Sequence, residues 1–472
     1  MAQSLSGQLA RRAPRPAAPS GLVGPRPEPY PSPAAVPAVL ALVGLLIVAM
    51  WWRDTSPSAV HGLGPAVTAV GDLLGLVGTY LVLVQLLLMA RLRWFERAVG
   101  LDRLASWHRA LGTNVVLTLC LHGLLVTVGY ALTSHHGLLG EPLHLIHLFR
   151  FIIEAVVALA VFVAVGVTSA RAARRRLSYE TWYWIHVAVY AAVILAALHQ
   201  VESGVDFVGH PLNQALWILL YVAVAGCILA TRVGGPVRIY LRHQMRVEAV
   251  VPEAPDVLSV WVRGRDLDQL GTDAGQFFLW RFLVRGHLFS AHPYSVSSLP
   301  DRRRLRITVK TAGDHSGRIG ELRPGDRVLA EGPFGHFTMR RRTRLRCLLV
   351  AGGSGIAPIR SLAEALARTR PTRPDDIVVL YRASTPDDLL FRHELDTLAR
   401  HRVLTVHYLV GRRRDLGFDP LGPGRLHHLV PDAAGRDVWI CGPEGMVTVA
   451  TRSLRRLGVP TRQLHLERFS LW

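Results

Sequence analysis

The sequence predicts a multidomain membrane protein, in which an all-α bundle of six transmembrane helices precedes an antiparallel β-barrel and an α/β domain with a parallel sheet. Three observations predict this order. The mean hydropathy of the chain is +0.27, six long apolar runs lie before about residue 235, and strand-like alternation replaces them afterwards. We expect a disordered, uncleaved tail over 1–34, the bundle over 35–233, the barrel over 237–340 and the α/β domain over 345–472.

Each apolar run approaches the ~20 residues that cross a bilayer as a helix. The runs are Val36–Trp52, Ala66–Ala90, Arg109–Leu132, Leu148–Ala170, Trp182–His199 and Leu212–Thr231. Connections 91–109, 171–176 and 232–246 are rich in arginine, whereas 53–65, 133–147 and 200–211 carry almost none. Arginine-rich connections stay in the cytoplasm. We therefore expect a multi-pass protein of the cell membrane, with both termini and the soluble domains in the cytoplasm.

The positive charge does not by itself indicate nucleic acid. The formal net charge is +20 with 54 Lys and Arg residues, yet Lys310 is the one lysine, a bias that genome composition explains. Because the arginines follow the membrane topology, we expect membrane lipid and no nucleic acid as a partner. The cysteines Cys120, Cys227, Cys347 and Cys441 show no paired spacing, which argues against a disulfide framework, a zinc site and an iron–sulfur cluster.

Four histidines inside the apolar runs are the first candidates for chemistry, because ionisable residues in a span are costly and usually functional. His108 and His122 lie 14 residues apart on the third run, and His186 and His199 lie 13 apart on the fifth. These separations correspond to about 21 and 20 Å along parallel helices. Two pairs of imidazoles at two depths could ligate two b-type haems. The alternative is that they are packing or proton-relay histidines.

The rotation of the two helices supports this pairing only in part. Fourteen residues are about 3.9 turns, which keeps His108 and His122 near one face, but thirteen are about 3.6 turns, so His186 and His199 point apart on an ideal helix. Local winding or tilt would have to compensate.

Two groups in the second outer connection and the fourth run have open interpretations. The histidines His135, His136, His144 and His147 could bind a metal or be ordinary loop residues. Arg150 and Glu154 are spaced as a structural i,i+4 pair, or they could contact an anion or a haem propionate.

The second half of the chain divides by pattern into two domains. Residues 257–262, 305–310 and 327–330 alternate as strands and are separated by turn signals, which indicates the small antiparallel barrel. From residue 345 the pattern becomes strand, glycine loop, helix and strand, with a helix expected over Pro358–Ala367. That order is typical of a parallel α/β sheet.

The segment His292-Pro-Tyr-Ser-Val-Ser-Ser resembles the flavin motif of ferredoxin–NADP reductase-type domains, and the histidine at 292 resembles the variant found in membrane-bound ferric reductases and NADPH oxidases. The resemblance implies FAD bound noncovalently by the motif and, at its pyrophosphate, by the segment 313–318. The implied FAD-binding residues are His292, Pro293, Tyr294, Ser295, Ser297, Ser298, Gly313 and Ser316. Gly332–Gly335 matches the family's turn that closes the barrel.

A glycine loop, Ala351-Gly-Gly-Ser-Gly-Ile-Ala-Pro358, follows an apolar strand and precedes a helix, so its amides can face a pyrophosphate. Pro358 would occupy the favoured first helical position. The loop resembles the nicotinamide-nucleotide loop of the same family, and Cys441-Gly-Pro resembles its second loop, which places a cysteine near the nicotinamide. The implied nucleotide-binding residues are Gly352, Gly353, Gly355, Pro358, Arg382, Ser384, Gly442 and Pro443. Arg382 and Ser384 slightly favour NADPH over NADH, although Arg382 could be an ordinary surface arginine.

The carboxyl end also resembles this family, whose members carry an aromatic residue that stacks on the flavin. Phe469 fits better than the terminal Trp472, and with Cys441 it is the residue we expect beside the reacting rings. The resemblance implies an NAD(P)H-dependent ferric reductase or NADPH oxidase-like flavocytochrome, which moves electrons through FAD and two haems to an outer ferric chelate or oxygen. Two alternatives stay open: an electron-transfer subunit that serves a protein partner, and a redox-sensing transporter.

Overall fold

The structure is a computed structural model, which describes residues 32–55, 60–134, 137–284, 291–311, 317–369 and 373–468. Its contacts separate a helical unit that ends at Gly235 from a second unit that begins at Pro236. Several predicted positions lie outside the described residues: the tail up to residue 31, His135, His136, Gly313, Ser316, Phe469 and Trp472.

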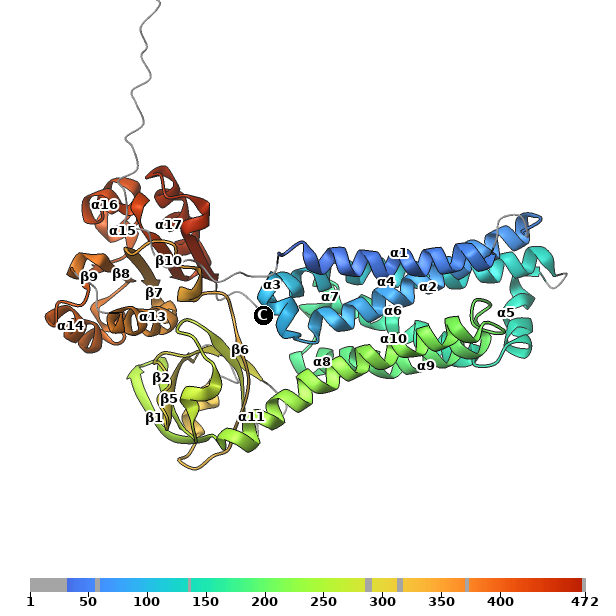
Figure 1. Ribbon diagram of the computed structural model, residues 1–472, viewed down its shortest axis with the longest axis horizontal. Coiled ribbons are helices and arrows are strands. Elements are labelled where there is room, and N and C mark those ends of the chain that lie inside the picture. The colour runs from blue at the N-terminus through green and yellow to red at the C-terminus, as the bar shows by residue number, and fades with distance from the viewer. Residues whose placement is uncertain are drawn as a thin grey trace, which may run out of the picture. The chain divides into compact units, whose positions relative to one another are not determined.

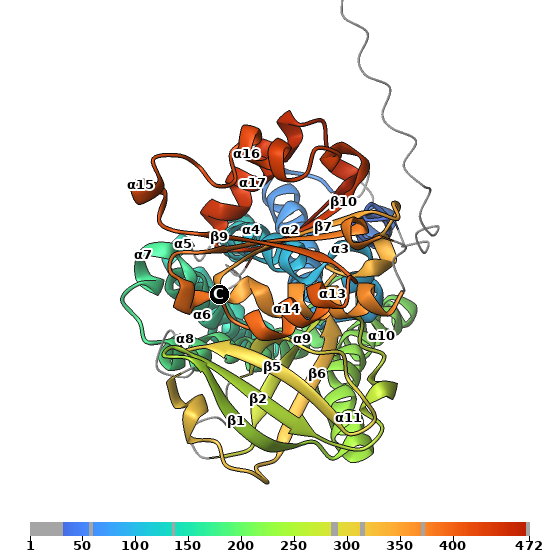
Figure 2. The ribbon, with the colours of Figure 1, turned by 90° about the vertical axis from the view of Figure 1, so that its left-hand side faces the viewer.

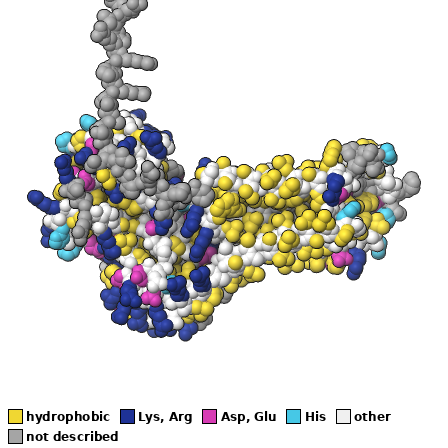
Figure 3. Space-filling model, viewed as in Figure 1, with side chains coloured by type: hydrophobic (Ala, Val, Ile, Leu, Met, Phe, Trp, Pro, Cys, Tyr) yellow, Lys and Arg dark blue, Asp and Glu magenta, His cyan; other side chains and the backbone are white. Residues whose placement is uncertain are grey.

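The described part of the helical unit contains six helices that are long and apolar enough to cross a membrane, as the apolar runs predict. They are α1 (Ala35–Thr55), α2 (Leu63–Met89), α4 (Leu101–Thr133), α6 (Ile152–Ser169), α8 (Tyr179–Val187) continued by α9 (Val189–Ser203), and α10 (Pro211–Leu229). Shorter helices connect them: α3 (Arg93–Val99), α5 (Gly137–Leu148) and α7 (Arg171–Arg174). The helices lie side by side in Figure 1, and hydrophobic side chains cover most of the visible face of this unit in Figure 3.

Glycines on one face of α2 allow α4 to pack closely against it. A Cβ atom at Gly71 would lie 2.9 Å from the Val126 side chain, and one at Gly78 would lie 2.8 Å from Leu119. Small residues at a helix interface are the usual way in which membrane helices approach each other. The same face carries Gly75, which contacts one of the membrane histidines.

The sixth helix is longer than the sequence predicts. We expected the apolar span to end near Thr231 and the chain to change character at residues 234–236, but α10 continues through the π-helical segment Ala230–Gly234 into α11 (Gly235–His243). The π winding holds more residues per turn than an α-helix, and Pro236, which has no N–H to donate, lies two residues after it. The Gly-Gly-Pro sequence therefore marks a change of winding and not the end of the helix.

The second unit begins with the antiparallel lobe, which we define as residues 246–342. One sheet has the order β1 (Arg246–Ala254), β2 (Val257–Arg263), β5 (Arg304–Lys310), and the other has the order β4 (His292–Ser295), β3 (Phe277–Phe282), β6 (Val328–Phe334). Apolar side chains from both sheets form one core, in which Trp280, Phe278 and Ile307 are buried. Isolated bridges join Arg246 to Arg327 and Val296 to Ile307. The two antiparallel sheets are thus established, while the closed barrel stays a prediction.

The remainder is the parallel lobe, which we define as residues 343–468. Its five parallel strands have the order β11 (Leu464–Arg468), β10 (Asp437–Gly442), β7 (Cys347–Gly352), β8 (Ile377–Ala383), β9 (Thr405–Val410). Helices α13 (Ile356–Arg368) and α14 (Arg392–Arg400) cover one face, and α16 (Pro423–Leu429) and α17 (Glu444–Arg456) cover the other (Figure 2). The direction of strand succession reverses between β7 and β10, the place where such sheets bind ligands.

Candidate functional site

The helical unit encloses a cavity of about 220 Å³ that both His122 of α4 and His199 of α9 line. Most of the other lining side chains are aliphatic or aromatic, among them Leu119, Phe149 and Phe162. The other charged or acidic groups of the lining are Asp72, Tyr130 and Asp206. Two imidazoles therefore share an apolar hollow, which is the environment that a haem requires.

The α2 backbone fixes the orientation of both histidines of α4. His122 Nδ1 lies 2.8 Å from the carbonyl oxygen of Gly71, and His108 Nδ1 lies 3.3 Å from that of Gln85. Because a carbonyl oxygen only accepts, each Nδ1 must carry the proton, and each Nε2 keeps its lone pair for a metal. Such a hydrogen bond is the usual partner of a metal-bound histidine. A Cβ atom at Gly75 would lie 2.8 Å from the His122 ring, so the glycine makes room for it.

The second pair of histidines faces each other as the spacing predicts. The ring centroids of His108 and His186 lie 6.0 Å apart. A metal–imidazole bond is about 2 Å long, so two imidazoles on opposite sides of one iron have ring centres about 6 Å apart. In addition, the Nδ1 atoms of His186 and His199 are buried without a hydrogen-bond partner among the described residues. These observations fit two bis-histidine haem sites.

The fifth span departs from regular winding at one point between its two histidines. The helix is interrupted at Ala188, where α8 ends and α9 begins, and ψ is −18°. His186 lies before the interruption and His199 after it, so the two rings need not follow ideal helical geometry. His186 also stacks on Trp182, with ring centroids 5.0 Å apart.

The sequence does not predict a polar network that lies beside His199. The side-chain amide of Gln200 donates to the hydroxyl of Thr79 on α2, and its carbonyl oxygen accepts from Trp217 Nε1 at 3.0 Å and from the Tyr221 hydroxyl at 2.9 Å. Gln200 thereby fixes α9 against α2 and α10. No spacing in the sequence connects these four residues.

Other polar groups of this unit make local pairs. Arg150 pairs with Glu202 at 3.5 Å and not with Glu154, so the i,i+4 pair expected as one alternative is wrong. His144 pairs with Glu141 at 2.9 Å. Within the described ranges no group of three or more His, Cys, Asp or Glu could hold a metal ion. Burial, with the nearby charge of Asp54, raises the pKa of Asp206 to about 6.

In the antiparallel lobe the predicted flavin motif forms strand β4, which pairs with β3. His292 and Tyr294 lie on the same side of the strand and stack, with ring centroids 6.2 Å apart. The carbonyl of Tyr294 accepts from Trp280 Nε1 at 2.9 Å, and burial raises the pKa of the Tyr294 hydroxyl to about 12. Pro293 is half-buried and Ser295 is buried. The residues Gly332–Phe334 belong to strand β6 and not to a turn.

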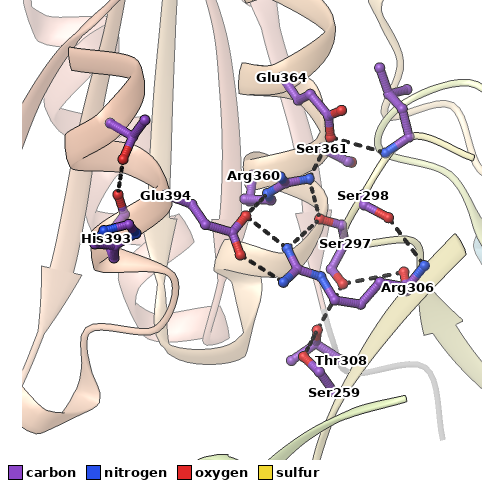
Figure 4. A network of polar contacts seen from close by, with 12 residues as sticks. Ser259, Ser297, Ser298, Arg306, Thr308, Arg360, Ser361, Glu364, His393 and Glu394 are labelled. Carbon is purple, nitrogen blue, oxygen red and sulfur yellow. Dashed lines mark hydrogen bonds and ion pairs between the residues drawn. The ribbon is translucent and has the colours of Figure 1, made fainter. Parts of the chain in front are cut away.

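The hydroxyls of Ser297 and Ser298 form hydrogen bonds within the antiparallel lobe. Ser297 Oγ lies 2.8 Å from Thr308 Oγ1 and 3.2 Å from the Arg306 carbonyl, and Ser298 Oγ accepts from the Arg306 backbone N–H at 3.1 Å (Figure 4). Both residues are buried. Their contacts hold the end of the motif against β5, while their predicted contact with FAD stays a prediction.

In the parallel lobe the two predicted nucleotide loops pack on each other at the carboxyl ends of β7 and β10. A Cβ atom at Gly355 would lie 2.3 Å from the Cys441 carbonyl oxygen, so only glycine fits. Gly442 adopts φ +157°, and a Cβ atom there would lie 2.9 Å from the Gly352 carbonyl oxygen. Pro358 is buried in the third position of α13, where backbone N–H groups still lack helical partners; the predicted first position was wrong.

These loops border a hollow of about 580 Å³. The predicted residues that line it are Gly352, Gly353, Arg382, Ser384 and Pro443. Arg382, however, points its guanidinium at backbone carbonyls: it donates to Leu409 at 2.8 Å and also to Ala383 and Gly411. Burial lowers the pKa of Arg382. Arg413, which the sequence reasoning missed, lines the same hollow with an exposed side chain.

Cys441 lies at the end of β10 and is fully buried in the core shared with α13. Burial raises the pKa of its thiol well above the usual value. The side chain is therefore a neutral thiol, and it is not among the residues that line the hollow.

Comparison with known proteins agrees with this arrangement. Residues 74–197 match the family model of the ferric reductase like transmembrane component, and residues 349–452 match the oxidoreductase NAD-binding domain. Ferredoxin–NADP reductase B of Sorangium cellulosum is 30% identical over 243 residues, which cover 48% of this chain and 97% of that relative. The chain belongs to the ferredoxin–NADP reductase family. It joins a reductase of this family to a ferric reductase-like membrane domain, and it is an oxidoreductase.

Two further relatives of this reductase are longer than the matched region. NADH oxidoreductase HCR of Escherichia coli is 29% identical over 224 residues, and NADPH oxidoreductase of Mycobacterium tuberculosis is 30% identical over 204 residues. The matches cover 46% and 42% of this chain, and the chain spans 65% and 52% of the two relatives. A solved structure, the flavohem-like FAD/NAD-binding domain of Vibrio cholerae nitric oxide dioxygenase, aligns with TM-score 0.41 at 21% identity, over 48% of this chain and 98% of that one.

Proposed function

We propose that this protein moves electrons from cytoplasmic NAD(P)H through FAD and two b-type haems to a small acceptor on the outer side of the membrane, a ferric chelate or oxygen. The observation that carries the proposal is the pairing of membrane histidines: His122 and His199 line one apolar cavity, and the His108 and His186 rings lie 6.0 Å apart. The family's reductase chemistry supplies the electron source.

The residues that would hold the haems are His108 with His186 and His122 with His199. The Nδ1 contacts of His108 and His122 with backbone carbonyls would leave Nε2 free to hold a haem iron and would make each imidazole a better donor. When bound, FAD takes two electrons as a hydride from NAD(P)H, and the haem irons take electrons one at a time and relay them across the membrane.

The residues that would hold FAD are His292–Ser295, with Gly313 and Ser316 at its pyrophosphate. NAD(P)H would lie against Gly352–Gly355 and Gly442–Pro443, where the two loops meet at the reversal of strand order. Phe469 would cover the flavin. We accordingly assign haem binding to 35–233, FAD binding by a barrel to 237–340 and NAD(P)H binding to 345–472. The exposed Arg413 supports a preference for NADPH, because a 2′-phosphate needs a cationic partner that Arg382 does not offer.

The arginine-rich connections support a cytoplasmic start for α4 and α8, and the proposed direction of transfer rests on this orientation. His108 and His186 are then the inner pair, and His122 and His199 are the outer pair. The purified protein should show two haems per chain by pyridine haemochrome, and anaerobic NADPH should reduce both flavin and haem absorbance. Protein that holds no haem would contradict the proposal and favour the transporter alternative, and haem-loaded protein whose flavin NADPH does not reduce would contradict the proposed electron source.

A further inference from the structure

A partly buried ion network joins the antiparallel lobe to the parallel lobe within the second unit (Figure 4). Arg306 of β5 is 4% exposed, and its guanidinium forks onto Glu394 of α14: NH1 lies 2.7 Å from Oε1 and NH2 lies 3.0 Å from Oε2. Such two-pronged contacts fix direction as well as distance. The Arg306 guanidinium also packs over the Phe391 ring at 4.3 Å.

Further contacts of this ion network involve helix α13. Arg360 Nε donates to Glu394 Oε2 at 2.6 Å, and its NH1 donates to the Ser297 carbonyl at 3.0 Å. One turn further along, Glu364 Oε2 accepts from the Leu299 backbone N–H at 3.2 Å. The carboxylate of Glu394 thus binds both an arginine of the antiparallel lobe and an arginine that holds the segment after β4.

The location of this network connects the two cofactor segments. Ser297 lies two residues after Ser295 of the flavin motif, and Arg360 lies five residues after Gly355 of the nucleotide loop. Arg360 and Glu364 link the two segments through their contacts with Ser297 and Leu299. We expect a change in these contacts to move the start of α13 relative to β4.

Stability of the interface does not depend on the ions alone. Apolar side chains cross it as well: Val257, Ala274 and Phe337 of the antiparallel lobe belong to one core with Ile359 and Leu362 of α13. Such a partly buried ion pair adds little net stability beside this core, but its two-pronged geometry favours one arrangement of the two lobes. Burial opposes ionisation of Glu394, and its hydrogen bonds and charge contacts with Arg306 and Arg360 outweigh burial and lower its pKa, so the carboxylate is charged at neutral pH.

We propose that Glu394, through Arg306 and Arg360, is a positioning residue that sets the alignment of the nicotinamide with the flavin. The inference rests on the proposed function, in which a hydride, two electrons with one proton, passes from the reduced nicotinamide to the flavin; NAD(P)H is oxidised and the flavin is reduced. A misplacement of about 1 Å can slow such a step about 100-fold. Glu394 is not among the residues that line the hollow at the nucleotide loops.

The test compares Glu394→Gln with Asp396→Asn in the full-length protein. Asp396 is a matched control, because it lies on the same helix and its partners Arg392 and Tyr408 both belong to the parallel lobe. Anaerobic stopped flow with NADPH separates the limiting rate of flavin reduction from the Kd. Hydrogen exchange of the Leu299 amide, measured without nucleotide, reports the alignment itself.

In Glu394→Gln the limiting rate should fall about 10- to 100-fold, with the Kd for NADPH within about threefold of wild type, and the Leu299 amide should exchange faster. Asp396→Asn should match wild type in all three. A Glu394→Gln rate equal to that of the control, or a slow variant with unchanged exchange, would overturn the inference. If the Glu394→Gln protein loses FAD, the same measurements are made on Arg360→Lys. Lysine keeps the positive charge but cannot bridge two acceptors in the same way. Wild-type protein whose flavin NADPH does not reduce would instead contradict the proposed function.

Discussion

Gly75→Ala tests whether the α2–α4 contact shapes the outer haem site. In a helix interior, replacing glycine by alanine normally stabilises by about 0.5–1 kcal/mol. At this position the added Cβ atom would lie 2.8 Å from both Nδ1 and Cε1 of His122. Carbon atoms in contact prefer about 3.5–4.0 Å, so the ring must move by about 1 Å. Helix propensity therefore predicts that Gly75→Ala stabilises α2, whereas the contact with His122 predicts that it disturbs the position of the ring.

The displacement acts on the hydrogen bond that fixes the tautomer of His122. Its Nδ1 lies 2.8 Å from the Gly71 carbonyl, and a shift of about 1 Å takes that pair beyond hydrogen-bond length. Loss of such an orienting bond typically lowers metal affinity about 10- to 100-fold. We therefore expect Gly75→Ala to lose most of the outer haem during purification and to keep the inner one.

The assay is haem content per chain by pyridine haemochrome, together with the reduced-minus-oxidised spectrum. Gly226→Ala is the matched control, because it places the same methyl group on a membrane helix where no atom lies within 4 Å. We predict about one haem in Gly75→Ala and two in Gly226→Ala. Full haem content with an unchanged spectrum in Gly75→Ala would refute the reasoning about the contact.

Three further predictions concern the second unit. Ser295→Ala should weaken FAD binding by about 1–3 kcal/mol, measured by FAD release, whereas Ser297→Ala should change it less because that hydroxyl already bonds within the lobe. Arg413→Ala should raise the KM for NADPH about tenfold with little effect on NADH, while Arg382→Met should lower the thermal midpoint because it removes the guanidinium that donates to three backbone carbonyls. Burial opposes ionisation of Asp432, but its contacts with two arginines outweigh burial and lower the pKa of the carboxyl. The ionised carboxylate therefore stabilises the folded protein at a pH above its pKa in the unfolded chain, and this stabilisation is lost as the pH falls through its pKa in the folded protein. Asp432→Asn should flatten that acid decline in a pH series of thermal unfolding.

Hydropathy and arginine distribution are sufficient to predict the six spans, since both depend on the chain's own composition. They are not sufficient for helix ends. The sequence Gly234–Pro236 predicts the end of a helix, but the helix continues through the π-helical segment Ala230–Gly234 to His243. Likewise, the 13-residue spacing of His186 and His199 looks unfavourable until the interruption at Ala188 is known. The residue types at these positions do not predict where a helix departs from ideal winding.

The two glycine loops of the parallel lobe could be predicted because their close packing leaves no room for a Cβ atom at Gly355 and Gly442. Contacts between segments that are distant in the sequence could not be predicted. Arg306 and Glu394 are 88 residues apart, and nothing at either position marks a partner. Arg382 shows the opposite failure: its place at the end of β8 suggests a phosphate ligand, but its guanidinium donates to three backbone carbonyls.

Electron transfer across a sealed bilayer tests the central claim most directly. Proteoliposomes enclosing ferricyanide and receiving NADPH outside report whether electrons cross, because neither reagent passes the membrane. Wild-type protein should reduce the enclosed ferricyanide. His122→Leu should keep NADPH-driven reduction of the flavin and inner haem but lose reduction of the acceptor, and His108→Leu should stop at the flavin. Reduction of enclosed ferricyanide by His122→Leu at the wild-type rate, or no reduction by a wild-type protein that holds both haems and FAD, would contradict the account.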